Sequence, residues 1–128
     1  MKGEVMKGIY VNQLSAHGVP YADLIVKGIK TIETRSRNML SACVGERVAI
    51  VRTIRGKKPE VVGYANIYAH EKSKDRASDV IETYVPHGSQ YCDNRHFYHL
   101  SLACECKPYP LPANAVRHGR SWCEFNKE

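Results

Sequence analysis

The sequence has no run of apolar residues long enough to cross a membrane, since a spanning helix needs about 20 of them in succession. Its first residues, MKGEVMKGIYV, also lack the uninterrupted apolar stretch of a secretory signal peptide. These two absences predict a cytoplasmic protein without a membrane partner. Internal repeats, linkers and low-complexity tracts are missing as well. A chain of 128 residues suits one domain, so we expect a single domain over residues 1–128.

The five cysteines include no Cys-x-x-Cys pair, and their number is odd. An odd, irregularly spaced set is typical of free thiols rather than of a disulfide framework. The segment CDNRHFYH places Cys92, His96 and His99 close together, and Cys104 and Cys106 follow. Zinc needs a tetrahedral set of such nitrogen and sulfur ligands. Free cysteines are commonly just small buried apolar side chains, however, and we expect neither a metal site nor another cofactor.

Negative charge is scarce relative to positive charge. Lys and Arg number 19 against 13 Asp and Glu, which gives a net charge of +6 and an isoelectric point near 9.1. A basic domain of this size favours a polyanionic partner, above all nucleic acid. The same charge would also keep a protein soluble, so charge alone does not decide between these interpretations.

Short stretches of alternating apolar and polar residues, separated by turn signals, predict a chain made mostly of strands. The expected strands cover residues 7–15, 30–36, 45–54, 60–71, 96–111 (stopping at its prolines) and 119–125. Short helices are expected at 19–28, ended by Gly28, and at 73–85. Gly63 inside a strand indicates a bulge or a close backbone approach. The predicted fold class is α+β, a small mixed β-barrel of five or six strands with two or three short helices.

Charged residues crowd into one predicted strand. The segment GIKTIETRSRN, residues 28–38, holds Lys30, Glu33, Arg35 and Arg37. Because side chains alternate along a strand, Glu33 and Arg35 should stand side by side, while Ile32 points into the core. An Arg fork can grip a phosphate or a base edge, a Glu can accept from an amine such as that of cytosine, and a Lys adds a point charge. The plainer interpretation is a solvated strand face with a surface ion pair worth under ~1 kcal/mol.

The stretch PYADLIVKGIKTIETRSRN resembles the signature of the ASCH domain, a family of the PUA-like β-barrel superfamily. The family's pattern is a short apolar helix followed by Gly-x-Lys-x-x-Glu-x-Arg, matched here by Gly28, Lys30, Glu33 and Arg35. The segments GERVAIVRT and VVGYANI resemble the family's next two strands, and the resemblance covers about residues 8–106. It implies a PUA-like barrel that binds RNA or a nucleotide in a basic cleft lined by Lys30, Glu33 and Arg35.

The resemblance also implies an alternative function. Some small bacterial members similar to this chain are amidohydrolases that deacetylate acetylcytidine, and other members are metal-dependent ribonucleases. Those amidohydrolases use a Lys, a Thr three residues later and a Glu from a later strand. Lys30 matches the first position, but Glu33 stands where the Thr would be. If the chain is a small hydrolase, Glu33 is the best candidate general base and Lys30 the best oxyanion stabiliser, with Glu71 as a second carboxylate.

Two further segments add cations around the motif. RTIRGKKP, residues 52–59, is predicted to be a hairpin tip that contacts phosphates, although a solvated turn would carry the same charges. Its cations are Arg52, Arg55, Lys57 and Lys58. VRHGRSW, residues 116–122, is predicted to be a flexible basic lip in which Trp122 either stacks on a base or packs down on the domain.

Overall fold

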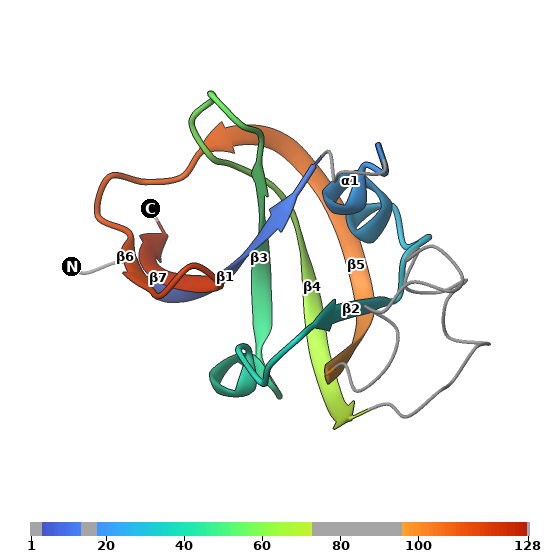
Figure 1. Ribbon diagram of the computed structural model, residues 1–128. Helices are drawn as coiled ribbons and strands as arrows, with labels where there is room; N and C mark the ends of the chain where they lie inside the picture. Colours follow the sequence, from blue (N-terminus) through green and yellow to red (C-terminus); the bar gives the residue numbers. More distant parts are fainter. Residues whose placement is uncertain (1–3, 14–17, 73–95, 128) are drawn as a thin grey trace.

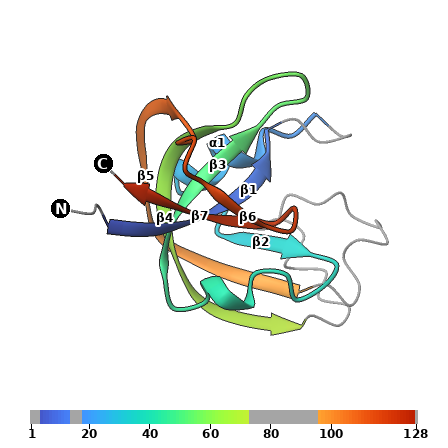
Figure 2. The same cartoon turned by 90° about the vertical axis from the view of Figure 1, so that its left-hand side faces the viewer.

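A computed structural model gives the fold and describes residues 4–13, 18–72 and 96–127. Strands dominate it and form one curled sheet, shaped like half a barrel (Figures 1 and 2). In chain order the elements are β1 (Glu4–Asn12), α1 (Tyr21–Val26), β2 (Ile32–Arg35), the 3-10 turn η1 (Ser41–Cys43), β3 (Arg47–Thr53), β4 (Glu60–Lys72), β5 (His96–Pro110), β6 (Val116–His118) and β7 (Trp122–Lys127). The mostly-strand architecture is consistent with the predicted PUA-like barrel. The described residues hold seven strands, however, and not the five or six predicted. The helix predicted at 73–85 lies outside the described residues.

The order of strands in the sheet is β2-β5-β4-β3-β1-β7-β6. β1 and β3 run parallel, with Ile9 opposite Ile50, and every other neighbouring pair is antiparallel. A parallel pair needs a crossover, and here the crossover between β1 and β3 contains α1 and β2. The charged motif of residues 28–37 therefore lies in the connection that the parallel pair requires.

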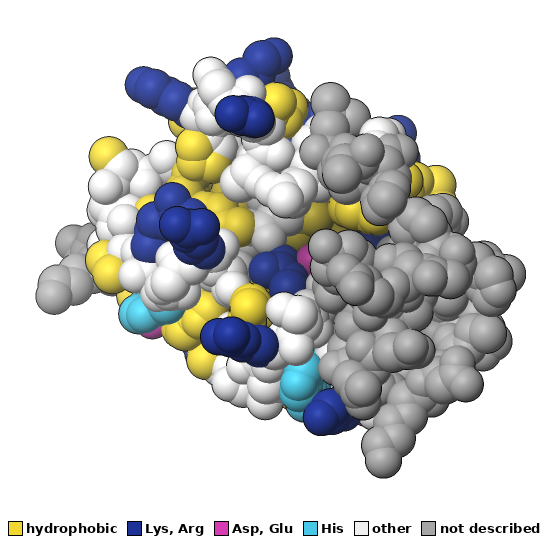
Figure 3. Space-filling view, in the orientation of Figure 1, with side chains coloured by type: hydrophobic (Ala, Val, Ile, Leu, Met, Phe, Trp, Pro, Cys, Tyr) yellow, Lys and Arg dark blue, Asp and Glu magenta, His cyan; other side chains and the backbone are white. Residues whose placement is uncertain are grey.

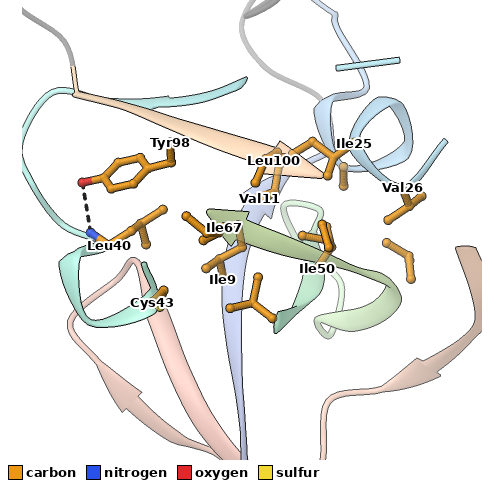
Figure 4. Packing of buried hydrophobic residues seen from close by; sticks show 14 residues of the cluster. Ile9, Val11, Ile25, Val26, Leu40, Cys43, Ile50, Ile67, Tyr98 and Leu100 are labelled. Atoms are coloured by element: carbon orange, nitrogen blue, oxygen red, sulfur yellow. Dashed lines mark hydrogen bonds between the residues drawn. The ribbon is translucent and has the colours of Figure 1, made fainter. Parts of the chain in front are cut away.

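The central strands are buried on both faces, which explains the nearly continuous apolar run of β3. Val48 and Ile50 belong to the larger apolar cluster, while Ala49 and Val51 belong to the smaller one. The larger cluster includes α1 and is shown in Figure 4; we call this side of the sheet the helix face. The opposite side, which we call the hairpin face, borders β6 and β7. Its cluster consists of Tyr10, Ala49, Val51, Val61, Cys123 and Phe125.

The short helix α1 packs on the helix face through a stripe of apolar residues. Ala22, Ile25 and Val26 are its buried residues, at the spacing of one helical face. Gly28, with a φ of +74°, ends the helix as predicted, because this left-handed backbone conformation suits glycine. None of the helices in the described residues has the length and apolar character needed to cross a membrane.

Gly63 confirms the prediction made for it. A Cβ at this position would lie 2.2 Å from the carbonyl oxygen of Cys104 and 2.6 Å from a methyl carbon of Val26. The ladders to β3 and β5 also shift register beside it, as at a β-bulge. The glycine thus lets α1 and β5 approach the backbone of β4 closely.

One of the sequence predictions is wrong in detail. Residues 116–122 are not a flexible lip, because Val116–His118 form β6 and Gly119, with a φ of +68°, turns the chain into β7. All three residues of β6 are exposed, so no apolar alternation marked the strand. β5 ends at Pro110, so the prediction that this strand stops at its prolines is confirmed. β2 pairs only with residues 96–99, so the prolines lie where β5 has one open edge and a missing N–H costs no ladder bond.

Candidate nucleic-acid interface

The turn after α1 brings Lys30 to the start of β2. The backbone N–H groups of Ile29 and Lys30 both donate to the carbonyl oxygen of Leu24, each at 3.0 Å. Lys30 precedes the first residue of the strand, so the alternation of β2 does not fix its direction. Its side chain can therefore reach the carboxylate of Glu33, which Arg35 also contacts.

Lys30, Glu33 and Arg35 come together as one ion triad. Oε1 of Glu33 lies 3.6 Å from Nζ of Lys30. Oε2 of Glu33 accepts from Nε of Arg35 at 3.0 Å and lies 2.9 Å from its Nη2. Lys30 is only 2% exposed and Glu33 only 8%. The solvated surface ion pair of the plainer interpretation does not describe this arrangement.

The strand register explains why these charges are buried. Glu33 lies opposite Tyr98 on β5, and Arg35 lies opposite His96, so these residues share one face of the β2–β5 pair. That face is the helix face, because the fully buried Tyr98 belongs to its cluster. Ile32 lies opposite His99; it is buried, but on the other face. The prediction that Ile32 points into the core, away from Glu33 and Arg35, is confirmed.

Arg35 also joins two strands that are far apart in the sheet order. Its Nη2 donates to the backbone carbonyl of Tyr10 at 2.7 Å, which links β2 at the sheet edge to β1. This bond spans the open side of the curled sheet. A guanidinium has five N–H donors, and the two on Nη1 of Arg35 have no partner among the described residues. Arg35 therefore keeps two donors for a further acceptor while it makes its structural contacts.

Lys30 is held from several directions. Its Nζ donates to the carbonyl oxygen of Ile32 at 2.5 Å and lies 5.2 Å from the centre of the Tyr21 ring. A ring face attracts a cation at this distance, and a carbonyl does so more strongly. Because Lys30 is almost fully buried, its effect at the surface is mainly that of its charge.

The outlying cations occupy different places. Arg37 is exposed just beyond β2. Arg55, Lys57 and Lys58 are exposed on the turn between β3 and β4, and both cartoon views place that turn away from β2 (Figures 1 and 2). Figure 3 shows Lys and Arg side chains at several points of this side of the molecule. Some of them stand in a central recess, beside an acidic side chain.

Arg52 does not belong to the hairpin tip, although the sequence grouped it there. It lies within β3, where its Nη2 donates to Glu60 at 2.9 Å and its Nη1 donates to Asp23 on α1 at 3.4 Å. This half-buried residue fixes α1 to the β3–β4 ladder. Its guanidinium is already occupied by carboxylates, so it is a weaker candidate for phosphate contact than its three neighbours in the turn.

Trp122 begins β7 and is half-buried. Its ring stacks on that of His118, with centroids 4.1 Å apart, and Nζ of Lys7 lies 5.7 Å from it. The side chain also packs against the helix-face cluster. Packing against the domain therefore describes Trp122 better than a free stacking platform, although part of the ring remains accessible.

Two histidines near the motif were not predicted as site residues. His96 lies opposite Arg35, and its ring stacks on that of His70, with Nε2 of His70 2.8 Å from Nδ1 of His96. His70 in turn stacks on Tyr98. Burial, with His70 and Lys72 nearby, lowers the pKa of His96 below its ordinary value. Both histidines lie in segments that the sequence predicts to be strands. Only the pairing of β4 with β5 shows that they lie beside the motif.

Glu71 is not placed with the motif. It lies opposite Phe97 on β5, and its Oε1 is 3.2 Å from Nε2 of His99, on the face opposite to Glu33. The idea that Glu71 enters the motif's cleft as a second carboxylate therefore loses its geometric basis. Within the described ranges, no group of three or more His, Cys, Asp or Glu side chains is arranged to hold a metal ion. Cys92 lies outside the described residues.

Comparisons with known proteins point to one family. No family model matches the sequence, and no curated protein matches it. The fold matches the crystal structure of ASCH from Zymomonas mobilis with a TM-score of 0.59 and 25% identity, over 81% of this chain and 73% of that one. A serine-to-alanine variant of that protein matches with a TM-score of 0.64 and 22% identity, over 94% of this chain and 89% of that one. These matches confirm the resemblance to the ASCH domain family that the motif indicated.

Proposed function

We propose that the chain binds RNA or a nucleotide beside the ion triad of Lys30, Glu33 and Arg35. The observation that carries this proposal is the state of Arg35. Its guanidinium is held in place by Glu33 and the Tyr10 carbonyl, while its two Nη1 donors remain unengaged in the described structure. A fixed guanidinium with free donors suits a phosphate oxygen or an acceptor on a base edge.

The charge balance of the triad supports an anionic ligand. Two cations surround one carboxylate, so the group carries a surplus of one positive charge. Charged groups buried in this way are costly to desolvate, and a well-packed apolar set is often at least as stable. A function that needs the surplus charge would explain why the triad replaces apolar packing on the helix face.

The exposed cations would then add affinity rather than selectivity. Arg37 continues the chain directly after β2, and Arg55, Lys57 and Lys58 form a separate basic turn. Contacts of this kind track the backbone of a nucleic acid without reading its bases. A single nucleotide would engage only the triad, whereas an RNA strand could also reach the turn.

The test is binding of short single-stranded RNAs, measured by fluorescence anisotropy over a series of salt concentrations. Arg37→Ala should weaken binding about 3- to 10-fold, because it removes an exposed cation without touching the triad. The matched control is Lys107→Ala, an exposed cation on β5 at a distance in sequence from the motif. The joint variant Arg55→Ala, Lys57→Ala, Lys58→Ala should reduce the salt slope by up to about 2. No binding at low salt, or equal effects of Arg37→Ala and Lys107→Ala, would refute the proposal.

A small hydrolase is the second candidate, and one observation favours it. Lys30 and Glu33 are in contact in a nearly buried site, as a catalytic pair would be. Both oxygens of Glu33 are already held by cations, however, which leaves little room for it to accept a proton from substrate. Incubation with acetylcytidine and with short RNAs, with and without divalent metal, decides the matter. Product that disappears in Lys30→Ala would establish the enzyme.

A further inference from the structure

A pocket lies on the hairpin face, away from the ion triad. It has a volume of about 280 Å³ and is lined by side chains from β4, β5, β7 and the connection that follows β5. None of its residues belongs to the Gly-x-Lys-x-x-Glu-x-Arg motif. Its aromatic wall consists of Tyr64, Tyr109 and Phe125.

Strand alternation separates this pocket from the motif. Phe125 belongs to the hairpin-face cluster, and Tyr64 and Tyr109 pack against that cluster. Glu33 and Arg35, by contrast, share a face with Tyr98 of the helix-face cluster. Figures 1 and 2 show β6 and β7 on the opposite side of β3 from α1. A ligand in this pocket would therefore not contact the triad.

The aromatic wall offers both stacking surfaces and a polar handle. The hydroxyl oxygens of Tyr64 and Tyr109 are 2.7 Å apart, so one hydroxyl donates to the other. The second hydroxyl hydrogen then remains available for an acceptor in the pocket. Burial and the bond to Tyr109 raise the pKa of Tyr64, which keeps the Tyr64 hydroxyl protonated at neutral pH.

The rim of the pocket carries donors and one positive charge. Oδ1 of Asn114 accepts from the backbone N–H of Asn126 at 2.9 Å, which leaves the NH₂ group of Asn114 free among the described residues. Nζ of Lys127 lies 5.2 Å from the centre of the Tyr64 ring, and Lys127 is exposed. Its ammonium can therefore turn from the ring toward an anion at the mouth of the pocket.

We propose that this pocket binds one unstacked nucleotide, with a pyrimidine base as the best fit. The base stacks on Tyr64 or Tyr109, since bases stack readily on aromatic side chains. Acceptor atoms on the edge of the base accept hydrogen bonds from the free tyrosine hydroxyl and from the NH₂ group of Asn114. Lys127 pairs with the phosphate. The volume is near the lower end of the ~300–1,000 Å³ of small-molecule sites, which favours the smaller base. Lys127 at the rim disfavours a cationic ligand.

The probes are cytidine monophosphate, cytidine and a short cytidine-rich RNA, each titrated into ¹⁵N-labelled protein and followed by amide chemical shifts. Lys127→Ala should weaken the binding of cytidine monophosphate about 5-fold and leave the binding of cytidine unchanged, because only the phosphate contacts the ammonium group. Asn114→Ala should weaken both ligands, also about 5-fold. Lys107→Ala, the charge-matched control outside the pocket, should change either affinity less than about 2-fold.

The same titrations separate this site from the triad. Amide shifts at residues 124–127 that persist in Arg37→Ala support the pocket, whether the free nucleotide or the RNA produces them. Comparing the affinities for the free nucleotide and the RNA tells which of the two the pocket prefers. Shifts confined to β2, or an affinity insensitive to both Lys127→Ala and Asn114→Ala, would overturn it while leaving the proposed function intact. Absence of saturable shifts up to about 10 mM of each small ligand, and with the RNA, would overturn it as well.

Discussion

The two faces of the sheet use polar groups in opposite ways. The helix face buries a lysine, a glutamate and much of an arginine against one another, next to a fully apolar cluster. The hairpin face buries no comparable charge within the described residues; its polar groups are tyrosine hydroxyls, and its cations lie over aromatic rings at the surface. A single substitution on the helix face should therefore lower the free energy of unfolding strongly. A matched substitution on the hairpin face should lower it only a little. Four predictions test this contrast.

The largest effect is expected from adding one methyl group on each face. In Gly63→Ala the new Cβ meets the backbone carbonyl of Cys104, which cannot move away, so the variant should lose about 4 kcal/mol or more, or fail to fold. In Gly8→Ala the Cβ meets only side chains on the hairpin face, Val51 at 3.0 Å and Cys123 at 3.3 Å. That variant should lose about 1 kcal/mol. Denaturant unfolding measures both, and equal losses would contradict the contrast.

The second comparison removes one buried carboxylate and one partly exposed carboxylate. Glu33→Gln leaves two buried cations without their counter-ion and should lower the free energy of unfolding by roughly 3 kcal/mol. Glu124 pairs with His118 at 3.0 Å on the β6–β7 hairpin, where both side chains are more than a third exposed. Glu124→Gln should therefore cost under about 0.5 kcal/mol. A Glu33→Gln variant as stable as Glu124→Gln would mean that the triad is solvated in solution.

The third comparison removes one tyrosine hydroxyl from each face. The Tyr98 hydroxyl donates to Oδ1 of Asn38 at 2.7 Å and accepts from the backbone N–H of Leu40 at 3.2 Å, a bond drawn in Figure 4. Tyr98→Phe leaves that buried N–H without its partner and should cost about 2 kcal/mol. Tyr64→Phe breaks one half-buried bond to Tyr109 and should cost about 0.5–1 kcal/mol. Thermal unfolding of the two variants, side by side, checks the order.

The smallest effect is a response to pH. The pKa of His96 is lowered from 6.5 by burial, His70 and Lys72, so the unfolded chain takes up a proton more readily than the folded one. Its contribution to stability is therefore present above pH 6.5 and is lost as the pH falls below that value. Amide exchange at the paired ends of β4 and β5 should quicken on acidification, and less so in His96→Asn. An unchanged pH response in His96→Asn would rule out this cause.

Local features of the sequence predicted much of the fold. The alternation in residues 45–54 and 60–71 found β3 and β4, and Gly28 and Gly63 marked a helix end and a close approach that the structure confirms. Strand alternation likewise predicted that Glu33 and Arg35 stand side by side, whereas only the family resemblance placed Lys30 with them.

Features set by contacts between distant strands were beyond local patterns. The burial of Lys30, for example, depends on α1 and β2 together. Arg52 looked like part of a turn because nothing local shows its partners, Asp23 and Glu60. The pocket on the hairpin face combines Tyr64 with Asn114 and Lys127, which no short window of sequence contains.

The pairing of β1 with β7 has a consequence for synthesis of the chain. Glu4 pairs with Lys127 and Ile9 with Trp122, so β1 waits for β7, which is synthesised much later. At roughly 5–20 residues per second, that wait on the ribosome is on the order of ten seconds. During it, one edge of β1 offers unpaired backbone groups to any other nascent chain, a known route to aggregation. The yield of folded protein would then depend on what binds that edge first. A chaperone would protect it, whereas another nascent chain that dissociates slowly would block it.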